Sequence, residues 1–449
     1  MTQVFALHTG YGLMTAVAAI DAGLVPDDGE RVLVPINSAA VPETNRAIHE
    51  SRQLRTLLGR FDRIEPLNPL LDPLHPTAWA PGETETPAWE RLLAHAWRVD
   101  PGDLDLFVQT PQVAPTRTLL SVFRNARITV VGDGLMTYAP IRSRMPRRIA
   151  GRVQSVLYPD VVPHLVPLLL AEVGARPVPV PAADFAAVVA EIDAASAHHD
   201  RTEHGSPAAL VLGQYLAALG LVSADDETAM QQEMVDCAVH RGARRIVFKP
   251  HPTAPPALAD RVRERAAGHG VAFEPYRGDA PAEVLTRRLS AVAVVAGFST
   301  ALPTVRALYG TPTEAVGNTA VLAALRPFEN GNRIPATIVD ATNRPGDPYA
   351  QPGRLQHLVD AVGYCMQPRI ARDLRERAEE LLDGIDPDER ARYFTPRRLA
   401  ELQLPGGSRR LLTRLIVGDG GTGRTEETRL ALRGAGRRAQ RAWKAVSGR

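Results

Sequence analysis

Cysteine and aromatic residues are scarce in this chain. Only two cysteines occur in 449 residues, Cys237 and Cys365, and they are far apart. This argues against a disulfide framework or a cysteine-based metal site, and it fits a reducing compartment. Aromatic residues make up 5% of the chain and hydrophobic residues 45%, so we expect cores built mainly from Leu, Val and Ala.

Long apolar runs are also missing. Residues 1–12 have neither a basic start nor a long apolar region, so a cleaved signal peptide is not expected. The most apolar stretch, 161–170, is interrupted by prolines and a histidine. It falls well short of the ~18 to 20 apolar residues that cross a bilayer. We therefore expect a cytoplasmic protein, soluble or peripheral on the inner face of the cell membrane.

Basic charge is concentrated at the end of the chain. The formal net charge is +2, but residues 406–449 hold eleven Lys or Arg and three Asp or Glu, a balance of +8 that leaves −6 for the rest. With one aromatic residue, Trp443, and no recognisable module, this segment does not predict nucleic-acid binding. It is compatible with an amphipathic helix on an anionic membrane surface, and a disordered basic tail is the alternative.

What the chain does contain is a regular alternation of strand and helix patterns, which predicts parallel sheets with crossover helices. A loop rich in Pro, Thr and Glu is expected at 71–90, and a polar linker at 196–207. Helices are predicted at 14–23, 44–59, 226–241, 300–309 and 355–382, and strands at 4–9, 31–36, 103–109, 128–131, 209–215, 244–250, 271–276, 291–297, 313–317 and 336–340.

Three of these strands end in residues that suit an activated phosphate ester. The run from Arg244 to Pro252 places Lys249 and His251 just past a strand, since its prolines cannot join the ladder. In open parallel sheets this edge binds ligands. A histidine there can protonate a leaving phosphate, and a lysine can reach a base or phosphate oxygen. A capping or core histidine is the alternative for His251.

Acidic and hydroxyl residues follow two further strands. Asp133 lies between two glycines, where it could act as a general base on a sugar hydroxyl, or belong to an ordinary turn. Ser299 and Thr300 precede a predicted helix whose free N–H groups and dipole suit a phosphate, although plain capping explains them too. Together the three strand ends indicate group transfer from an activated phosphate ester.

In this order the motifs resemble those of the bacterial sialyltransferases, most closely the polysialyltransferase-type glycosyltransferase family. That group carries an acidic-acidic-Gly motif, a His-Pro motif and a Ser-Ser or Ser-Thr motif. The motifs span 133–300, and the wider resemblance covers roughly 4–340. It implies an α/β GT-B fold, in which two Rossmann-like domains face each other across a cleft. We place the acceptor-side domain at 1–200, the nucleotide-sugar-binding domain at 208–385 and a basic tail at 386–449.

The resemblance also implies substrates and roles. The donor would be CMP-sialic acid or a related CMP-linked nonulosonic acid, the acceptor a glycan or polysaccharide, and no cofactor or metal would be required. Asp133 resembles the general base, and His251 the residue that assists departure of CMP. Gly132 stands where the family has its first acidic residue, so acceptor placement is expected to differ.

Nucleotide contacts are implied at four further positions. Lys249 resembles a contact to the cytosine, Ser299 and Thr300 resemble phosphate ligands, and Glu283 in a Glu-Val-Leu segment resembles the ligand of the ribose hydroxyls. Two further pairs follow predicted strands, with plain turns as the alternative: Gly10 and Tyr11 on the acceptor side, and Gly213 and Gln214, just before Tyr215, near the nucleotide.

Other functions remain open on the sequence alone. A transferase that uses another activated donor, such as CDP-glycerol, also carries a His-Pro strand end. A non-catalytic anion- or nucleotide-binding protein of the same fold is a second alternative. Residues 418–425 differ from a P-loop by one letter, but Arg424 replaces the lysine, so we interpret them as a flexible joint and not as a nucleotide hydrolase site.

Overall fold

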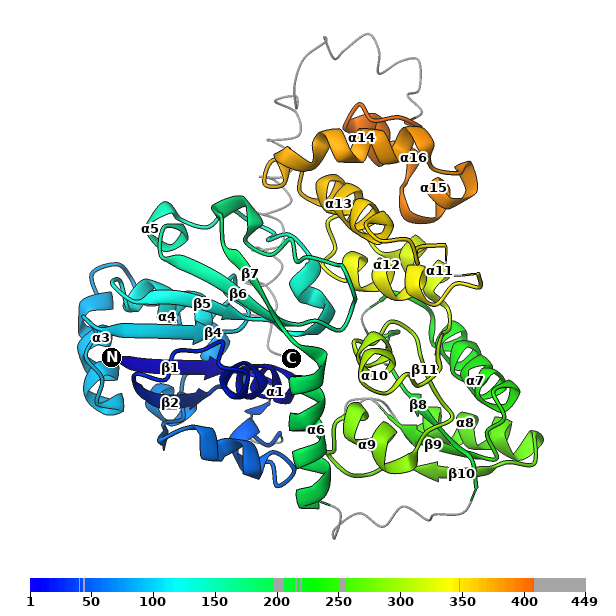
Figure 1. Cartoon of the computed structure of the whole chain (residues 1–449), viewed down its shortest axis with the longest axis horizontal. Helices are drawn as coiled ribbons and strands as arrows, with labels where there is room; N and C mark the ends of the chain where they lie inside the picture. The colour runs from blue at the N-terminus through cyan, green and yellow to red at the C-terminus, as the bar shows by residue number, and fades with distance from the viewer. Residues whose placement is uncertain are drawn as a thin grey trace, which may run out of the picture. The chain divides into compact units, whose positions relative to one another are not determined.

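Parallel strands build two separate sheets in this protein (Figure 1). The computed structural model describes residues 1–39, 41–42, 45–196, 206–214, 216–218, 220–250, 256–346 and 348–407. Both sheets belong to one compact unit, Met1–Leu381, and a second unit begins at Leu382.

The first sheet has seven strands in the order β3-β2-β1-β4-β5-β6-β7. Val4, Val32 and Leu106 lie opposite one another on the adjacent strands β1, β2 and β4 and are fully buried. Such apolar strands are typical of a parallel sheet covered on both faces. The strands are β1 (Thr2–Leu7), β2 (Glu30–Pro35), β3 (Arg63–Ile64), β4 (Leu104–Val108), β5 (Arg127–Val131), β6 (Val153–Pro159) and β7 (Arg176–Val180), and the helices beside them are α1 (Gly10–Asp21), α2 (Asn68–Leu71), α3 (Thr86–Trp97), α4 (Thr116–Val122) and α5 (Arg147–Ala150), with 3-10 turns that include η3 (Arg55–Arg60) and η5 (Gly134–Tyr138).

The second sheet has five strands in the order β10-β9-β8-β11-β12. Its strands are β8 (Ala208–Leu212), β9 (Arg245–Lys249), β10 (Ala272–Pro275), β11 (Ala293–Ala296) and β12 (Thr313–Ala315), and its helices are α7 (Ala224–His240), α8 (Pro256–Gly268), α9 (Ala282–Leu289), α10 (Ala301–Tyr309), α11 (Asn318–Ala324), α12 (Arg333–Thr342), α13 (Arg354–Met366) and α14 (Arg375–Gly384). In both sheets the first strand of the domain lies centrally and the chain winds outward on either side, as in Rossmann-like folds.

Helix α6 (Ala182–Ser196) joins the two halves of the first unit. It packs against α1 and η3 of the first half and against α9 and α10 of the second. Asp193 near its end forms an ion pair with Arg288 of α9 at 3.1 Å. The predicted α/β architecture of two Rossmann-like domains, the GT-B fold class, is confirmed by these two sheets.

Three of the predicted elements are wrong. Residues 336–340 lie within helix α12 and not in a strand, and the predicted helix at 44–59 contains only 3-10 turns in its described part. The single helix expected at 355–382 is two, α13 and α14. Strands β3, β6 and β7 are not among the predicted strands.

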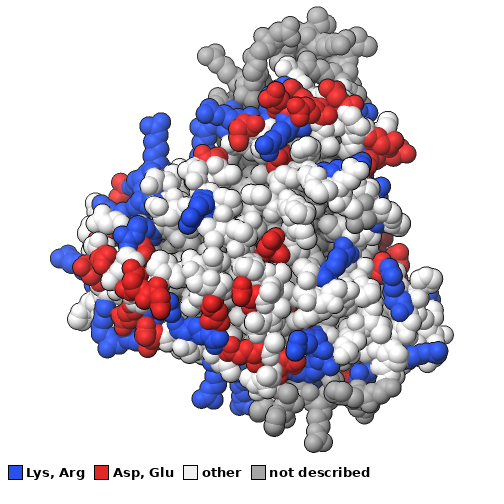
Figure 2. Space-filling model, in the orientation of Figure 1, with Lys and Arg blue, Asp and Glu red and all other residues white. Residues whose placement is uncertain are grey.

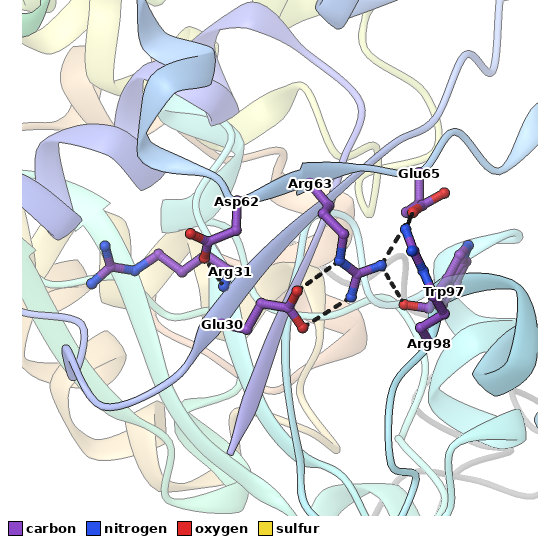
Figure 3. A network of polar contacts seen from close by, with 7 residues as sticks. All are labelled: Glu30, Arg31, Asp62, Arg63, Glu65, Trp97 and Arg98. Atoms are coloured by element: carbon purple, nitrogen blue, oxygen red, sulfur yellow. Dashed lines mark hydrogen bonds and ion pairs between the residues drawn. The ribbon is translucent and has the colours of Figure 1, made fainter.

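Salt bridges join the amino ends of β2 and β3, away from the edge where the candidate residues lie (Figure 3). The guanidinium of Arg63 donates to both carboxylate oxygens of Glu30, at 2.7 and 2.9 Å, and to the carbonyl of Trp97 at 2.7 Å. Asp62 accepts from the backbone N–H of Arg31 at 2.8 Å. Bidentate pairing of this kind fixes geometry as well as adding energy, so the network holds the short edge strand β3 in register.

The second unit is helical where it is described. Helix α15 (Pro387–Tyr393) is capped by Asp386, whose side chain accepts from two backbone N–H groups, and α16 (Pro396–Glu401) is capped by Thr395. Residues 408–449, which carry most of the predicted basic tail, lie outside the described residues. On the face shown in Figure 2, acidic and basic side chains are interspersed.

Candidate functional site

Asp133 lies directly after strand β5, at the carboxyl edge of the first sheet. Its side chain is partly buried, and its Oδ1 accepts a hydrogen bond from Thr9 Oγ1 at 3.0 Å. Its backbone N–H donates to Thr137 Oγ1 at 2.9 Å, which fixes the turn. Burial raises the pKa of Asp133 above the ordinary aspartate value, and the bond from Thr9 opposes that rise. A carboxylate with a raised pKa is a stronger base than an exposed one.

The two positions beside Asp133 favour glycine for different steric reasons. A Cβ on Gly132 would lie 2.7 Å from Thr137 Oγ1 and 3.0 Å from the carbonyl oxygen of Leu157. A side chain at this position would force Thr137 or the backbone of Leu157 to move, so the local packing favours glycine here. Gly134 has φ +61°, and a Cβ on it would lie 2.6 Å from Thr300.

Thr300 connects the second sheet to the loop of Asp133. It precedes α10, after strand β11, and its Oγ1 accepts from the backbone N–H of Leu135 at 3.3 Å. Its neighbour Ser299 is bonded to the same helix, because Ser299 Oγ accepts from the N–H of Ala301, the first helical residue, at 3.2 Å. Asp133 and Ser299 are 166 positions apart in the sequence. The structure thus brings Asp133 and the Ser-Thr pair to adjoining loops.

Gly10 and Tyr11 form the first turn of helix α1 and are not a free turn. Tyr11 Oη lies 3.2 Å from Thr304 Oγ1 of α10, so this candidate pair also bridges the two halves of the unit. Burial raises the pKa of Tyr11 far above its ordinary value, and the charges of Glu283 and Asp133 add to the rise. Tyr11 therefore stays neutral and can act only as a hydrogen-bonding or packing group.

Lys249 and Glu283 are electrostatic neighbours in the second half. Lys249 ends strand β9, and its Nζ lies 5.5 Å from the centre of the Tyr276 ring. Burial lowers the pKa of Lys249 while the Glu283 charge raises it. Glu283 is buried in the first turn of α9, where burial raises its pKa and Lys249 opposes the rise. The pair forms a buried polar group beside the carboxyl edge of the second sheet.

Gly213 and Gln214 tie three loops of the second sheet together. The N–H of Gly213 donates to the carbonyl of Lys249 at 2.9 Å. Gln214 Oε1 accepts from the N–H of Phe298 at 3.0 Å, so the loop after β8 is joined to the loop after β11. These bonds place Gln214 next to the loop that carries Ser299 and Thr300.

Two predicted residues, His251 and Tyr215, lie outside the described residues, and their roles stay predictions. Several arginines follow Asp133 between residues 142 and 152, and three of them have structural partners. Arg144 donates to the carbonyl of Arg369 at 3.0 Å. Arg152 donates to the carbonyls of Phe123 and Ala126, and Arg148 pairs with Glu83 at 3.1 Å.

Sequence reasoning missed the residues that hold Asp133 in place. Thr9 is the second residue after β1, and Gln109 directly follows β4 and is fully buried. Both obey the strand-end rule that singled out Asp133, so the signal existed. Their residue types, however, carry no chemistry of their own, and only the hydrogen bonds reveal their place in the site.

In the part of the chain that the structure describes, no three His, Cys, Asp or Glu side chains gather into a metal-binding group. Among the same residues, no helix combines the length and apolarity needed to cross a membrane.

Several solved structures are similar to this chain at low identity. A UDP-GlcNAc 2-epimerase from Neisseria meningitidis bound to UDP-GlcNAc has a TM-score of 0.43 and 10% identity, over 83% of this chain and 94% of that one. The MnaA–UDP structure from S. aureus has a TM-score of 0.41 and 12% identity, over 81% and 96%. The GT-B domain of a sialyltransferase from Photobacterium damselae has a TM-score of 0.40 and 11% identity, over 77% and 97%.

Family membership rests on the sequence. No curated protein matches the chain. The model of the alpha-2,8-polysialyltransferase family matches residues 3–317, which include both sheets and every described candidate residue. The chain is therefore a glycosyltransferase that belongs to the alpha-2,8-polysialyltransferase family.

Proposed function

We propose that this glycosyltransferase moves sialic acid, or a related nonulosonic acid, from a CMP-linked donor to a glycan acceptor with inversion at the anomeric carbon. Family membership supports the class of reaction. The donor and the mechanism are inferred from one observation: the loop of the candidate base Asp133 contacts the N-terminus of α10, which suits a phosphate group. The N–H of Leu135, two residues after Asp133, donates to Thr300 Oγ1 at 3.3 Å.

In the proposed reaction Asp133 acts on the acceptor. Its carboxylate takes the proton of a sugar hydroxyl as that oxygen forms a bond to the anomeric carbon of the donor. The bond from that carbon to the phosphate oxygen breaks at the same time, and CMP leaves with the electron pair. One displacement from the opposite side inverts the configuration.

The leaving phosphate would bind at the N-terminus of α10. Ser299 and Thr300 would supply hydroxyl hydrogen bonds, and the start of α10 would supply the positive end of a helix dipole. The N–H groups of Ala301, Leu302 and Thr304 are already bonded within this turn. His251 would give its proton to the departing phosphate. Negative charge builds up on the phosphate as the bond breaks, so these donors stabilise the transition state more than the bound donor.

The nucleotide would lie along the carboxyl edge of the second sheet. Lys249 is proposed to contact the cytosine and Glu283 the ribose hydroxyls, while Gly213 and Gln214 position the adjoining loop. Support comes from the electrostatic coupling of Lys249 and Glu283 and from the bond between Gln214 and Phe298. Gly10 and Tyr11 would line the acceptor side.

A thermal-shift panel of CMP, CDP, UDP, GDP and ADP tests the donor class. CMP should stabilise the protein selectively, by about 2.7 kcal/mol at a hundred times its Kd. Stronger stabilisation by CDP would favour a CDP-linked donor such as CDP-glycerol. No response to any nucleotide would contradict a nucleotide-dependent transferase and favour a non-catalytic protein of this fold.

The proposed reaction needs one base and a stabilised leaving phosphate, and no metal ion takes part in it. Turnover should therefore be unchanged when EDTA is added to the assay. Turnover that EDTA abolishes and Mg²⁺ or Mn²⁺ restores would contradict this part of the proposal.

A further inference from the structure

The hydroxyl of Thr9 makes three hydrogen bonds, which is all that a hydroxyl can make. Its oxygen accepts from the backbone N–H of Gly12 at 3.0 Å and from Gln109 Nε2 at 3.1 Å. It lies 3.0 Å from Asp133 Oδ1. Since both lone pairs are used, the remaining bond must be the one that the Thr9 proton makes to Asp133.

The orientation of the Gln109 amide is fixed independently. Its Oε1 accepts from two backbone N–H groups, those of His8 at 2.6 Å and Thr9 at 3.2 Å. A flipped amide would turn its NH2 group toward these donors and lose both bonds. Gln109 Nε2 therefore faces Thr9 as a donor, and within the described part of the chain the hydroxyl proton of Thr9 has Asp133 as its acceptor.

We propose that Thr9, oriented by Gln109, is a positioning residue that holds Oδ1 of Asp133 and leaves Oδ2 as the atom that takes the acceptor proton. The role of Oδ2 as the proton acceptor rests on the proposed function. Among the described residues no hydrogen bond reaches Oδ2, while the turn itself is fixed through the bond from the Asp133 N–H to Thr137. The base then presents a single defined oxygen to the acceptor hydroxyl.

Burial raises the pKa of Asp133, and the hydrogen bond from Thr9 is the main interaction that lowers it. Tyr11 of α1 and Tyr138 of η5 are both neutral, because burial raises their pKa values. Glu283 of α9 acts on Tyr11, and burial raises its own pKa as well. Loss of the Thr9 donor should therefore raise the pKa of Asp133 further, since hydrogen bonding favours the charged form.

Carbon-13 NMR of protein labelled at the aspartate carboxyl carbons measures that pKa directly. The Asp133 signal is assigned by its disappearance in Asp133→Asn. In Thr9→Val the carboxyl should titrate about one to two pH units higher than in the wild type. Thr9→Ser keeps the donor and should titrate like the wild type. Thr118→Val is the matched control, because the hydroxyl of this buried threonine donates to the carbonyl of Trp79, away from Asp133.

Loss of stability alone would not support the inference, since Thr9 also caps helix α1. Should Thr9→Val fail to fold, Thr9→Ala removes the same donor with a smaller side chain. An Asp133 titration that is identical in the wild type and in a folded donor-less variant would overturn the role of Thr9.

A kinetic arm separates this inference from the proposed function. With CMP-sialic acid as donor, the acidic limb of the pH profile of kcat/KM should shift to higher pH in Thr9→Val, by as many pH units as the carboxyl titration shifts. A wild type without turnover on any CMP-linked sugar would contradict the proposed function, while the carboxyl titration would still decide the role of Thr9.

Discussion

At Asp133 the burial that strengthens a base also costs the folded protein stability. Because burial raises the pKa, the unfolded chain loses this proton at a lower pH than the folded protein does. As pH rises through that interval the folded state is progressively disfavoured, and the ionised carboxylate is a net cost at neutral pH. The proposed reaction nevertheless requires the ionised form.

Asp133→Asn should therefore separate activity from stability. It removes the proton acceptor, so kcat should fall by about 10² to 10⁴. CMP affinity should remain unchanged, because no nucleotide contact is lost. The Tm at neutral pH should rise, since a neutral amide can still accept from Thr9. Steady-state kinetics, CMP titration and thermal unfolding measure the three effects, and an equal loss of CMP binding would indicate a structural role instead.

Gly134→Ala tests whether the contact between the two halves matters for turnover. Gly134 and Gly174 both have positive φ, at +61° and +78°, so alanine strains either backbone by about 1–2 kcal/mol. Only at Gly134 would the new Cβ meet Thr300, at 2.6 Å, while at Gly174 nothing lies within 4 Å. Gly134→Ala should lose more stability than Gly174→Ala, because its Cβ also crowds Thr300. Gly134→Ala alone should lose at least about tenfold in kcat/KM, because small displacements of reacting groups slow the reaction.

Gly174→Ala is thus the control for backbone strain. Equal activity of the two variants, measured as kcat/KM on the same acceptor, would show that the approach of Thr300 to Gly134 has no part in catalysis.

At the scale of elements, sequence patterns located the strands that glycine and proline mark clearly. Strand β9 ends at Lys249, one residue before the predicted end, and helix α10 ends at the predicted Tyr309, followed by Gly310 with φ +64°. Residues 336–340 were misread because Ile338 and Val339 are β-branched, yet they lie in the buried helix α12. Tertiary burial determined the structure there, and short-range propensity could not predict it.

The same limit applies to the site. The strand-end rule found Asp133 and Lys249 because their side chains carry chemistry that a sequence displays. It could not find the partners of Asp133, since the bond from Gln109 to Thr9 spans 100 positions. Hydrogen bonds between loops of neighbouring parallel strands depend on strand order, which the alternation of elements alone does not fix.

His8 links three elements and should make the first half sensitive to acid. Its Nδ1 lies 3.0 Å from Ser38 Oγ after β2, and its Nε2 lies 2.9 Å from Thr116 Oγ1 of α4. Burial lowers the pKa of His8 to about 4. The unfolded chain takes up this proton below its ordinary pKa of about 6.5, and the folded protein does so only near 4, so stability should fall as pH drops through this window.

His8→Gln should remove part of that acid sensitivity. Urea unfolding at several pH values between 4 and 7 gives the free energy of unfolding, and the slope of that free energy against pH should be smaller in the variant than in the wild type. The exposed His357→Gln serves as the control. A slope that is unchanged in His8→Gln would show that His8 does not carry the acid response.

At the scale of the whole molecule, the basic end of the chain is a candidate tether. Residues 406–449 carry a balance of +8, whereas the remaining residues sum to −6. At about 1 kcal/mol per basic residue near an anionic surface, such a segment could hold the enzyme at a membrane and still be released by salt. The last described helix, α16, ends at Glu401 and the described residues end at Gly407, so a truncation should be placed after Gly407.

Truncation after Gly407 should therefore abolish binding to anionic vesicles and leave turnover on a soluble acceptor intact. The cut keeps the bonds that close α16, from the N–H of Leu404 to the carbonyl of Leu399 and from the N–H of Gly407 to the carbonyl of Leu404. A full-length variant with Arg437, Arg438 and Arg441 changed to Gln should bind vesicles more weakly and lose less of its affinity when salt is added. Sedimentation with vesicles containing phosphatidylserine measures both effects. A truncated protein that loses the thermal shift with CMP, or that unfolds, would show instead that this segment belongs to the fold, because a surface tether takes no part in nucleotide binding.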